Sequence, residues 1–127
     1  MGANVRYIGK DVEKAIEFYT QALGFEVVMQ PAPGFARLSR GDLTLLLNAP
    51  GAGGAGTAGG QPEPGGWNRF QIEVDDLDAQ IERLRGVGVA TRGDRVTGKG
   101  GQQILIEDPS GNPIELFEGF DEREKSD

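Results

Sequence analysis

The residues that could do chemistry in this chain of 127 residues are carboxylates and arginines, because the sequence contains neither cysteine nor histidine. Without cysteine there can be no disulfide, thiolate metal site or thiol nucleophile. Without histidine, the chain alone cannot build a Ser-His-Asp triad or an iron site of two histidines and a carboxylate. A general base in this protein must therefore be a carboxylate.

One carboxylate has an unusual position. Glu115 lies in the segment EDPSGNPIELFE (107–118), where turn-forming residues are followed by a strand pattern. Ile114 and Leu116 share one face of that strand, and Glu115 and Phe117 share the other. We expect Glu115 to lie on a face that is not simply solvent.

Two other segments are weaker candidates for a functional site. The segment GDRVTGKG (93–100) nearly matches a phosphate-binding loop, but Gly100 replaces the required Ser or Thr, and a strand follows it instead of a helix. We interpret it as a glycine-rich hairpin. Glu107 and Asp108 lead into a turn, and we expect both to be solvated.

The charge of the chain narrows the classes of partner. Twenty acidic and 13 basic residues give a net charge of −7, which disfavours nucleic acid and leaves neutral or cationic small molecules. No apolar run reaches the roughly 20 residues that span a bilayer, so no membrane partner is expected. The first ten residues lack the apolar core of a secretory signal, and we expect a cytoplasmic protein.

The chain repeats itself. Two amphipathic helix patterns begin after a capping aspartate, Asp11 or Asp76, and end at a glycine. The strand patterns before them, 4–11 and 69–76, share the same offset of 65 residues. Asn4 and Arg69 are therefore equivalent positions.

Three strand-like segments follow each helix, which predicts an α+β fold of two βαβββ modules in one chain. The segments are 25–30, 35–40 and 43–48 in the first half and 89–94, 102–107 and 113–118 in the second. We expect a single domain, 1–127, because one such module cannot bury its sheet alone. Its parts are module one (about 4–50), a Gly-rich linker (51–66), module two (about 67–118) and a charged tail (119–127).

The linker and the last turns add two expectations. Eight of the sixteen linker residues are glycine, so the linker should be the most mobile internal segment. Aligning the turn glycines before the last strands, Gly41 and Gly111, makes Leu45 the counterpart of Glu115.

The duplicated modules, the segment FYTQALGFEV and the closing DPSGNPIELFE together resemble the vicinal-oxygen-chelate superfamily over residues 4–118. That superfamily includes glyoxalase I, extradiol dioxygenases, and fosfomycin- and bleomycin-resistance proteins. The resemblance implies that the two sheets pair to form a cup, with helices outside and the ligand inside. Family members are commonly dimers, which implies a homodimer here.

The resemblance also implies where a metal would be held, on the first and last strands of each module. Those positions are Asn4, Leu45, Arg69 and Glu115 in this chain. Only Glu115 matches the family pattern, and a guanidinium repels a divalent ion. We therefore expect no metal and no other cofactor, and an Arg69–Glu115 pair in place of the metal.

Counting every second residue along the strands predicts the lining of the cup. The candidate ligand-binding residues are Asn4, Arg6, Leu45, Leu47, Trp67, Arg69, Gln71, Glu73 and Phe117. Arg6 would bind an anion or pair with Glu73 or Glu115. Trp67 would stack on a ligand or pack at an edge. The Arg69–Glu115 pair would anchor a ligand, hold strands together, or do both.

Two functions follow from this lining. The first is a metal-free small-molecule-binding protein, as the resemblance to the bleomycin-resistance branch implies. The second is a metal-independent glyoxalase-like lyase or isomerase with Glu115 as catalytic base and Arg6 or Arg69 at an oxyanion. A carboxylate paired with arginine is a weak base, which favours binding. A zinc- or nickel-dependent glyoxalase is the least favoured reading.

Overall fold

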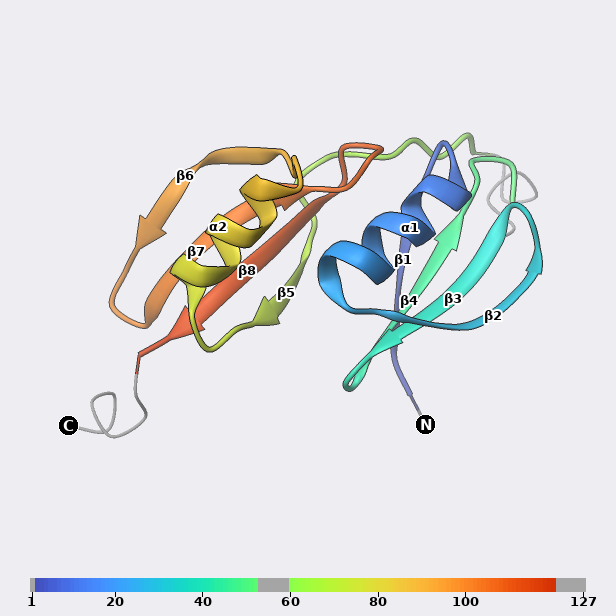
Figure 1. Cartoon of the computed structure of the whole chain (residues 1–127). Coiled ribbons are helices and arrows are strands. Elements are labelled where there is room, and N and C mark those ends of the chain that lie inside the picture. The colour runs from blue at the N-terminus through green and yellow to red at the C-terminus, as the bar shows by residue number, and fades with distance from the viewer. Residues whose placement is uncertain (1, 53–59, 121–127) are drawn as a thin grey trace. The chain divides into compact units, whose positions relative to one another are not determined.

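The computed structural model describes residues 2–52 and 60–120, and it confirms the duplicated α+β fold (Figure 1). The first module contains β1 (Asn4–Ile8), α1 (Val12–Leu23), β2 (Glu26–Ala32), β3 (Phe35–Arg40) and β4 (Leu43–Asn48). The second contains β5 (Phe70–Glu73), α2 (Leu77–Gly86), β6 (Thr91–Thr97), β7 (Gly101–Glu107) and β8 (Pro113–Gly119). Each module thus has the order βαβββ.

Each module forms its own four-stranded mixed sheet. The strand orders are β1-β4-β3-β2 and β5-β8-β7-β6. The first and last strands of each module are parallel, and the other neighbours are antiparallel. The chain divides into two compact units, Met1–Gly66 with Asp108–Asn112 and Trp67–Glu107 with Pro113–Asp127. The turn before β8 therefore belongs to the unit that contains the first sheet.

Both helices begin after the predicted aspartate, and α1 ends at a glycine as predicted, whereas the C-cap of α2 is Val87 and not a glycine. The Asp11 carboxylate accepts a hydrogen bond from the Lys14 amide at 3.1 Å, and α1 ends at Gly24 with a φ of 72°. In α2 the Asp76 carboxylate accepts from the Ala79 amide at 3.0 Å. Both caps satisfy amides that have no partner inside the helix.

Leu45 and Leu47 were expected to line the ligand site, and that prediction is wrong. Leu45 pairs in register with Val5, and Leu47 pairs with Tyr7. Tyr7 lies close enough to Tyr19 of α1 to affect its ionisation, so this face packs against the helix. Both leucines are fully buried there and belong to the core of the first module.

The wrong assignment came from aligning the turns. In β4, Leu46 pairs with Arg6, just as Glu115 pairs with Gln71 in the second module. Leu46 is therefore the structural counterpart of Glu115. The two turns differ in length, since two residues separate the last paired positions of β3 and β4 and five separate those of β7 and β8. Turn glycines in loops of unequal length do not report strand register.

The second sheet buries the residues that the alternation predicted. Ile114 and Leu116 of β8 pair in register with Phe70 and Ile72 of β5, and all four are buried. Glu118 lies on the same face of β8 and accepts a hydrogen bond from the Leu77 amide, at the start of α2, at 2.7 Å. This face therefore lies against α2.

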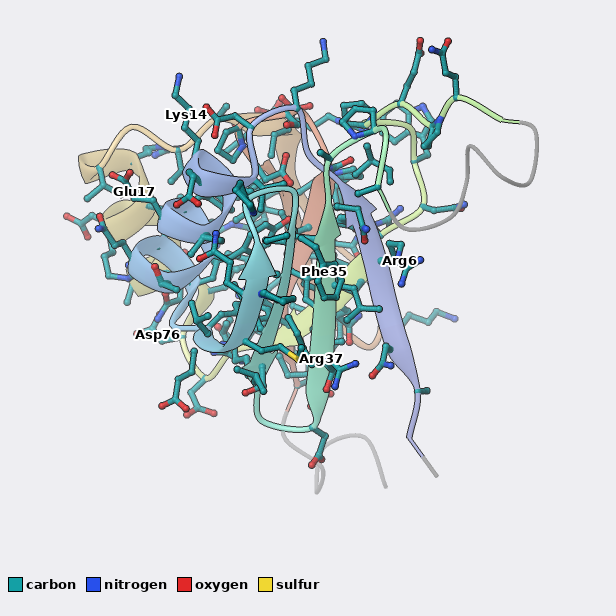
Figure 2. The ribbon with its side chains drawn as sticks, turned by 90° about the vertical axis from the view of Figure 1, so that its right-hand side faces the viewer. Arg6, Lys14, Glu17, Phe35, Arg37 and Asp76 are labelled. Carbon is teal, nitrogen blue, oxygen red and sulfur yellow. The ribbon has the colours of Figure 1, made fainter. Side chains whose placement is uncertain are left out.

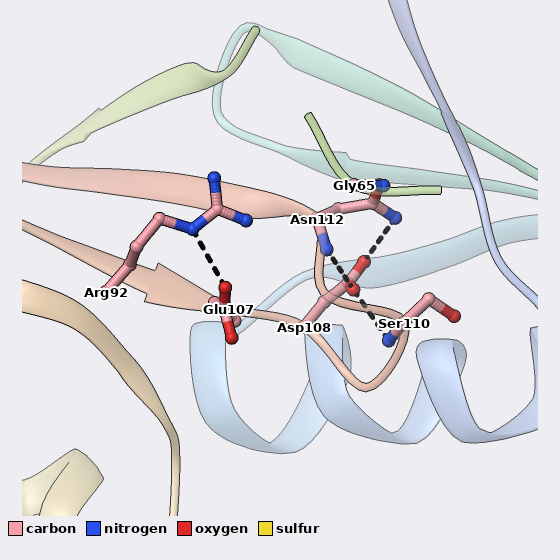
Figure 3. A network of polar contacts seen from close by, with 6 residues as sticks. All are labelled: Gly65, Arg92, Glu107, Asp108, Ser110 and Asn112. Atoms are coloured by element: carbon pink, nitrogen blue, oxygen red, sulfur yellow. Dashed lines mark hydrogen bonds and ion pairs between the residues drawn. The ribbon is translucent and has the colours of Figure 1, made fainter. Parts of the chain in front are cut away.

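The turn before β8 is built around a buried carboxylate, and the expectation that Asp108 is solvated is wrong. Asp108 is 5% exposed. Its side chain accepts a hydrogen bond from the Tyr19 hydroxyl at 2.8 Å. It accepts three more within the turn, from the Ser110 amide, the Asn112 amide and the Asn112 side chain, at 2.9 Å each (Figure 3). These donors satisfy a charge that would otherwise be costly to bury.

The same turn is bound to β1 and to the end of the linker. The Asn112 side chain donates to the Ile8 carbonyl at 2.7 Å, and the Lys10 amide donates to the Ser110 hydroxyl at 2.9 Å. The Gly65 amide donates to the Asn112 side-chain oxygen at 2.7 Å. A turn from the end of the chain is thus fixed to residues near its beginning.

Two earlier expectations fall partly outside the described residues. The linker 51–66, for which mobility is predicted, includes residues 53–59, which lie outside the described residues. Residues 121–127, most of the charged tail, also lie outside the described residues. In the parts of the chain that are described, no helix has the length and apolar character needed to span a membrane.

The Tyr19 phenol provides a test of this packing. Burial raises the pKa of Tyr19 well above its ordinary value of 10.0, and the Asp108 carboxylate raises it further. The unfolded chain loses the phenolic proton near pH 10, while the folded chain keeps it. We therefore expect stability to be complete below about pH 10 and then to fall by up to about 1.4 kcal/mol per pH unit because of this group.

The free energy of unfolding in urea, measured near pH 8 and near pH 11, checks this prediction. Tyr19→Phe should be less stable by about 1–3 kcal/mol near pH 8, because it loses the hydrogen bond to Asp108. It should lose less stability than the wild type between the two pH values. An equal loss in both proteins would contradict the raised pKa.

Candidate functional site

The face of the second sheet opposite α2 carries the candidate site. Glu115 pairs in register with Gln71, and Phe117 pairs with Glu73. These four residues alternate with the buried positions that face α2, so their side chains lie on the other side of the sheet. These four residues therefore share one face of the sheet, as the period-2 alternation predicted.

Both oxygens of the Glu115 carboxylate are hydrogen-bonded on that face. Arg69 donates from Nε to Oε1 at 3.0 Å, and Gln71 donates from Nε2 to Oε2 at 2.6 Å. The Glu115 side chain is 10% exposed and that of Arg69 is 31% exposed. The predicted Arg69–Glu115 contact is present, and Gln71 completes it.

This arrangement sets what Glu115 can do chemically. Each carboxylate oxygen already accepts a hydrogen bond, one from a guanidinium and one from an amide. The group is better suited to hold a fixed pattern of donors and acceptors on the sheet.

The residues at this position do not suit a divalent metal ion either. Arg69 occupies one of the positions where the resembled family would place a ligand, and its charge is permanent. In the described part of the chain, no group of three or more acidic side chains could hold a metal ion. The donor set matches an arginine–carboxylate pair and not a metal centre.

A second polar group lies on the same face. Arg92 of β6 pairs in register with Leu105, which in turn pairs with Glu115. The Arg92 guanidinium donates from Nε to Glu107 at 2.8 Å (Figure 3) and lies 4.5 Å from the centre of the Trp67 ring. Trp67 is 67% exposed, so one tryptophan is held by a cation and remains largely accessible.

Arg92 and Glu107 were not predicted as site residues. The candidate residues were taken from the first and last strands of each module and the residues next to them. Arg92 and Glu107 lie on the other strands. The signal that could have identified them is the period-2 alternation of β7, which puts Glu107 on the same face as Leu105. Glu107, expected to be solvated, is instead half-buried in an ion pair.

The first module contributes different residues. Asn4 and Arg6 are exposed on β1, on the face opposite α1, as the alternation predicted. By strand register, Arg6, Leu46 and Arg37 form one row across β1, β4 and β3 on that face. Figure 2 labels the two arginines of this row. The apolar Leu46 stands where the second module has Glu115.

Comparisons with known proteins agree with this architecture. The family model described as Glyoxalase/Bleomycin resistance protein/Dioxygenase superfamily matches residues 3–116. None of the curated proteins is similar enough to count as a match.

Several solved structures are similar over nearly the whole chain. Lactoylglutathione lyase from Agrobacterium tumefaciens is 24% identical, with a TM-score of 0.76 over 94% of this chain and 93% of that one. A superfamily member from Sphaerobacter thermophilus is 26% identical, with a TM-score of 0.75 over 93% and 96%. TnmS3, an antibiotic binding protein from a Streptomyces species, is 26% identical, with a TM-score of 0.68 over 94% and 98%.

The contacts of Glu115 predict how it affects stability. Glu115→Gln removes the negative charge that pairs with Arg69 and replaces one of the two acceptor oxygens with an amide nitrogen. We expect the free energy of unfolding to fall by about 1–3 kcal/mol. Glu73→Gln, on the same face but exposed, should change it by no more than about 0.5 kcal/mol. Equal effects of the two substitutions would contradict the role of the hydrogen bonds.

Proposed function

Since the chain belongs to the Glyoxalase/Bleomycin resistance protein/Dioxygenase superfamily, we propose that it is a metal-free protein that binds a small molecule without changing it. Such a function is represented among its structural neighbours by TnmS3, an antibiotic binding protein. The proposal places the ligand on the face of the second sheet opposite α2.

One observation carries the proposal: both oxygens of Glu115 already accept hydrogen bonds, from Arg69 and Gln71. The carboxylate is paired with a cation and held in position by an amide, which favours a role in shaping a binding site over proton abstraction or metal ligation. Arg69, at 31% side-chain exposure, still presents guanidinium N–H groups beyond the Nε bond. These can donate to a carbonyl, carboxylate or hydroxyl group of a ligand.

The neighbouring groups support a drug-like or metabolite ligand. Trp67, held by Arg92, offers an exposed aromatic surface on which a planar or cationic group can stack. Phe117 adds apolar surface on the same face of β8. A few directed polar groups among apolar ones are what small-molecule sites usually present.

Arg69→Ala tests the proposed site. A ligand is first identified by the shift in melting temperature that it causes in a panel of antibiotics and metabolites. We expect Arg69→Ala to weaken its binding about tenfold or more, because the polar anchor is lost. Arg85→Ala, in the last turn of α2, is the matched control and should leave the affinity unchanged.

The same experiment separates three roles of the pair. If Arg69→Ala and Glu115→Gln lower the melting temperature but leave the affinity intact, the pair is purely structural and the proposed site is wrong. If Glu115→Gln abolishes turnover while the ligand still binds, the protein is an enzyme with Glu115 as general base. Loss of affinity without any turnover supports the binding function.

Elemental analysis tests the metal-free part of the proposal. We expect purified protein to hold far less than one equivalent of zinc, nickel or iron per chain, because a guanidinium stands beside the carboxylate. A tightly held equivalent that disappears in Glu115→Gln would overturn it. Chelators should leave the melting temperature unchanged.

We propose further that the chain is a cytoplasmic homodimer. The edge strand β2 exposes Val27, Val28 and Met29 by 46, 55 and 42%, and such a patch is suited to contact another subunit. Sedimentation equilibrium should detect a dimer, which Val28→Glu should weaken. Val87→Glu, at an equally exposed position after α2, is the control and should not weaken it. A monomer in the wild type would contradict the proposal.

A further inference from the structure

The face of the first sheet opposite α1 carries polar atoms that have no partner. Asn48, at the end of β4, is fully buried, and neither its Nδ2 nor its Oδ1 atom has a hydrogen-bond partner among the described residues. The Nε atom of Arg37 on β3 is also buried without a partner. A buried amide or guanidinium nitrogen left unpaired is costly, so a cluster of such atoms needs an explanation.

The strand register places these atoms near one another. Asn48 pairs with Phe35, and Arg37 pairs with Leu46, two residues away on β4. Diagonal neighbours of this kind lie about 7–8 Å apart at Cα, within the reach of an arginine side chain. Asn48 also pairs with Ile8 on β1, so the amide lies between Phe35 and Ile8 in one row.

We propose that this face binds a carboxamide, lactam or similar group of a ligand through Asn48 and Arg37. The three unpaired atoms comprise two donors, Arg37 Nε and Asn48 Nδ2, and one acceptor, Asn48 Oδ1. Their partner must therefore accept hydrogen bonds and also donate one. A carboxamide does both, whereas a carboxylate at neutral pH only accepts.

A residue next to Asn48 could contact another part of the same ligand. Phe35 is half-buried beside the amide and offers a ring edge or face to an aromatic part of the same ligand (Figure 2). Because Asn48 is fully buried, the groups around its amide must move for a ligand to reach it. The site uses residues of the first sheet only, so it is independent of Arg69 and Glu115.

Benzamide, benzoate and N,N-dimethylbenzamide distinguish the proposed chemistry. Each is titrated into the ¹⁵N-labelled full chain while the amide signals, including the side-chain pair of Asn48, are followed by NMR. We expect benzamide to shift the Asn48 side-chain signals and to bind about tenfold more tightly than the other two, which lack a donor for Oδ1. Equal affinities, or shifts that leave Asn48 unaffected, would overturn the proposal.

Two variants complete the test. Asn48→Leu should abolish benzamide binding and raise the melting temperature of the free protein, because it removes an unpaired buried amide. A lowered melting temperature would show that the amide has a partner inside the protein, against the proposal. Arg37→Gln should weaken benzamide binding severalfold, and Arg85→Gln on α2 is its control. Should Asn48→Leu fail to fold, benzamide affinity unaltered in Arg37→Gln would refute the site.

Discussion

The buried Asp108 carboxylate is the contact on which much of the first unit depends. It accepts four hydrogen bonds from Tyr19, Ser110 and Asn112, and the turn that contains it is bonded in addition to Ile8 and Lys10. Four neutral donors satisfy the hydrogen-bonding capacity of this carboxylate, so it needs no cation as a partner. The turn therefore closes onto α1 and β1, and β8 begins directly after it.

Glu115 is also a buried carboxylate that needs hydrogen-bond donors, but its donors are of a different kind. Its partners are a guanidinium and an amide, of which Arg69 remains partly accessible to solvent. Asp108 is enclosed by the backbone and side chains of its own turn and by one phenol, which leaves no donor for a ligand. Glu115 is held by a guanidinium, a group with five N–H donors, whose side chain is 31% exposed. The two buried carboxylates thus differ in how their hydrogen-bonding capacity is satisfied, because their donors differ.

The duplication and the alternation of residues made most of the fold predictable. Capping aspartates, amphipathic helix patterns and strand patterns identify both helices and the eight strands of the described residues. The offset of 65 residues leads to the Arg69–Glu115 contact. The facing of Leu45 and Leu47 was not predictable in this way, because it depends on how the chain enters β4 after a shorter turn. A shift of one residue moves every side chain to the other face.

Asp108 and Arg92 show a second reason why the sequence does not predict every contact. Both interact with residues that are distant in sequence, Asp108 with Tyr19 and Arg92 with Trp67. A charged residue next to a turn normally reads as solvated, and only the tertiary contact reverses this. Local sequence patterns do not reveal partners that are distant in the chain. The sequence therefore predicted the strands of the candidate site but not every residue on them.

The two modules have diverged at corresponding positions. Leu46 and Asn48 of the first sheet correspond by register to Glu115 and Phe117 of the second. In the second sheet both oxygens of the carboxylate accept hydrogen bonds, while in the first the Asn48 amide and Arg37 Nε have no partner within residues 2–52 and 60–120. Unpaired buried groups lower stability, and a group supplied by a ligand restores the missing hydrogen bonds. Specificity for an amide-like group would then come from the first sheet, since a ligand that lacks a donor or an acceptor leaves one of these atoms unpaired.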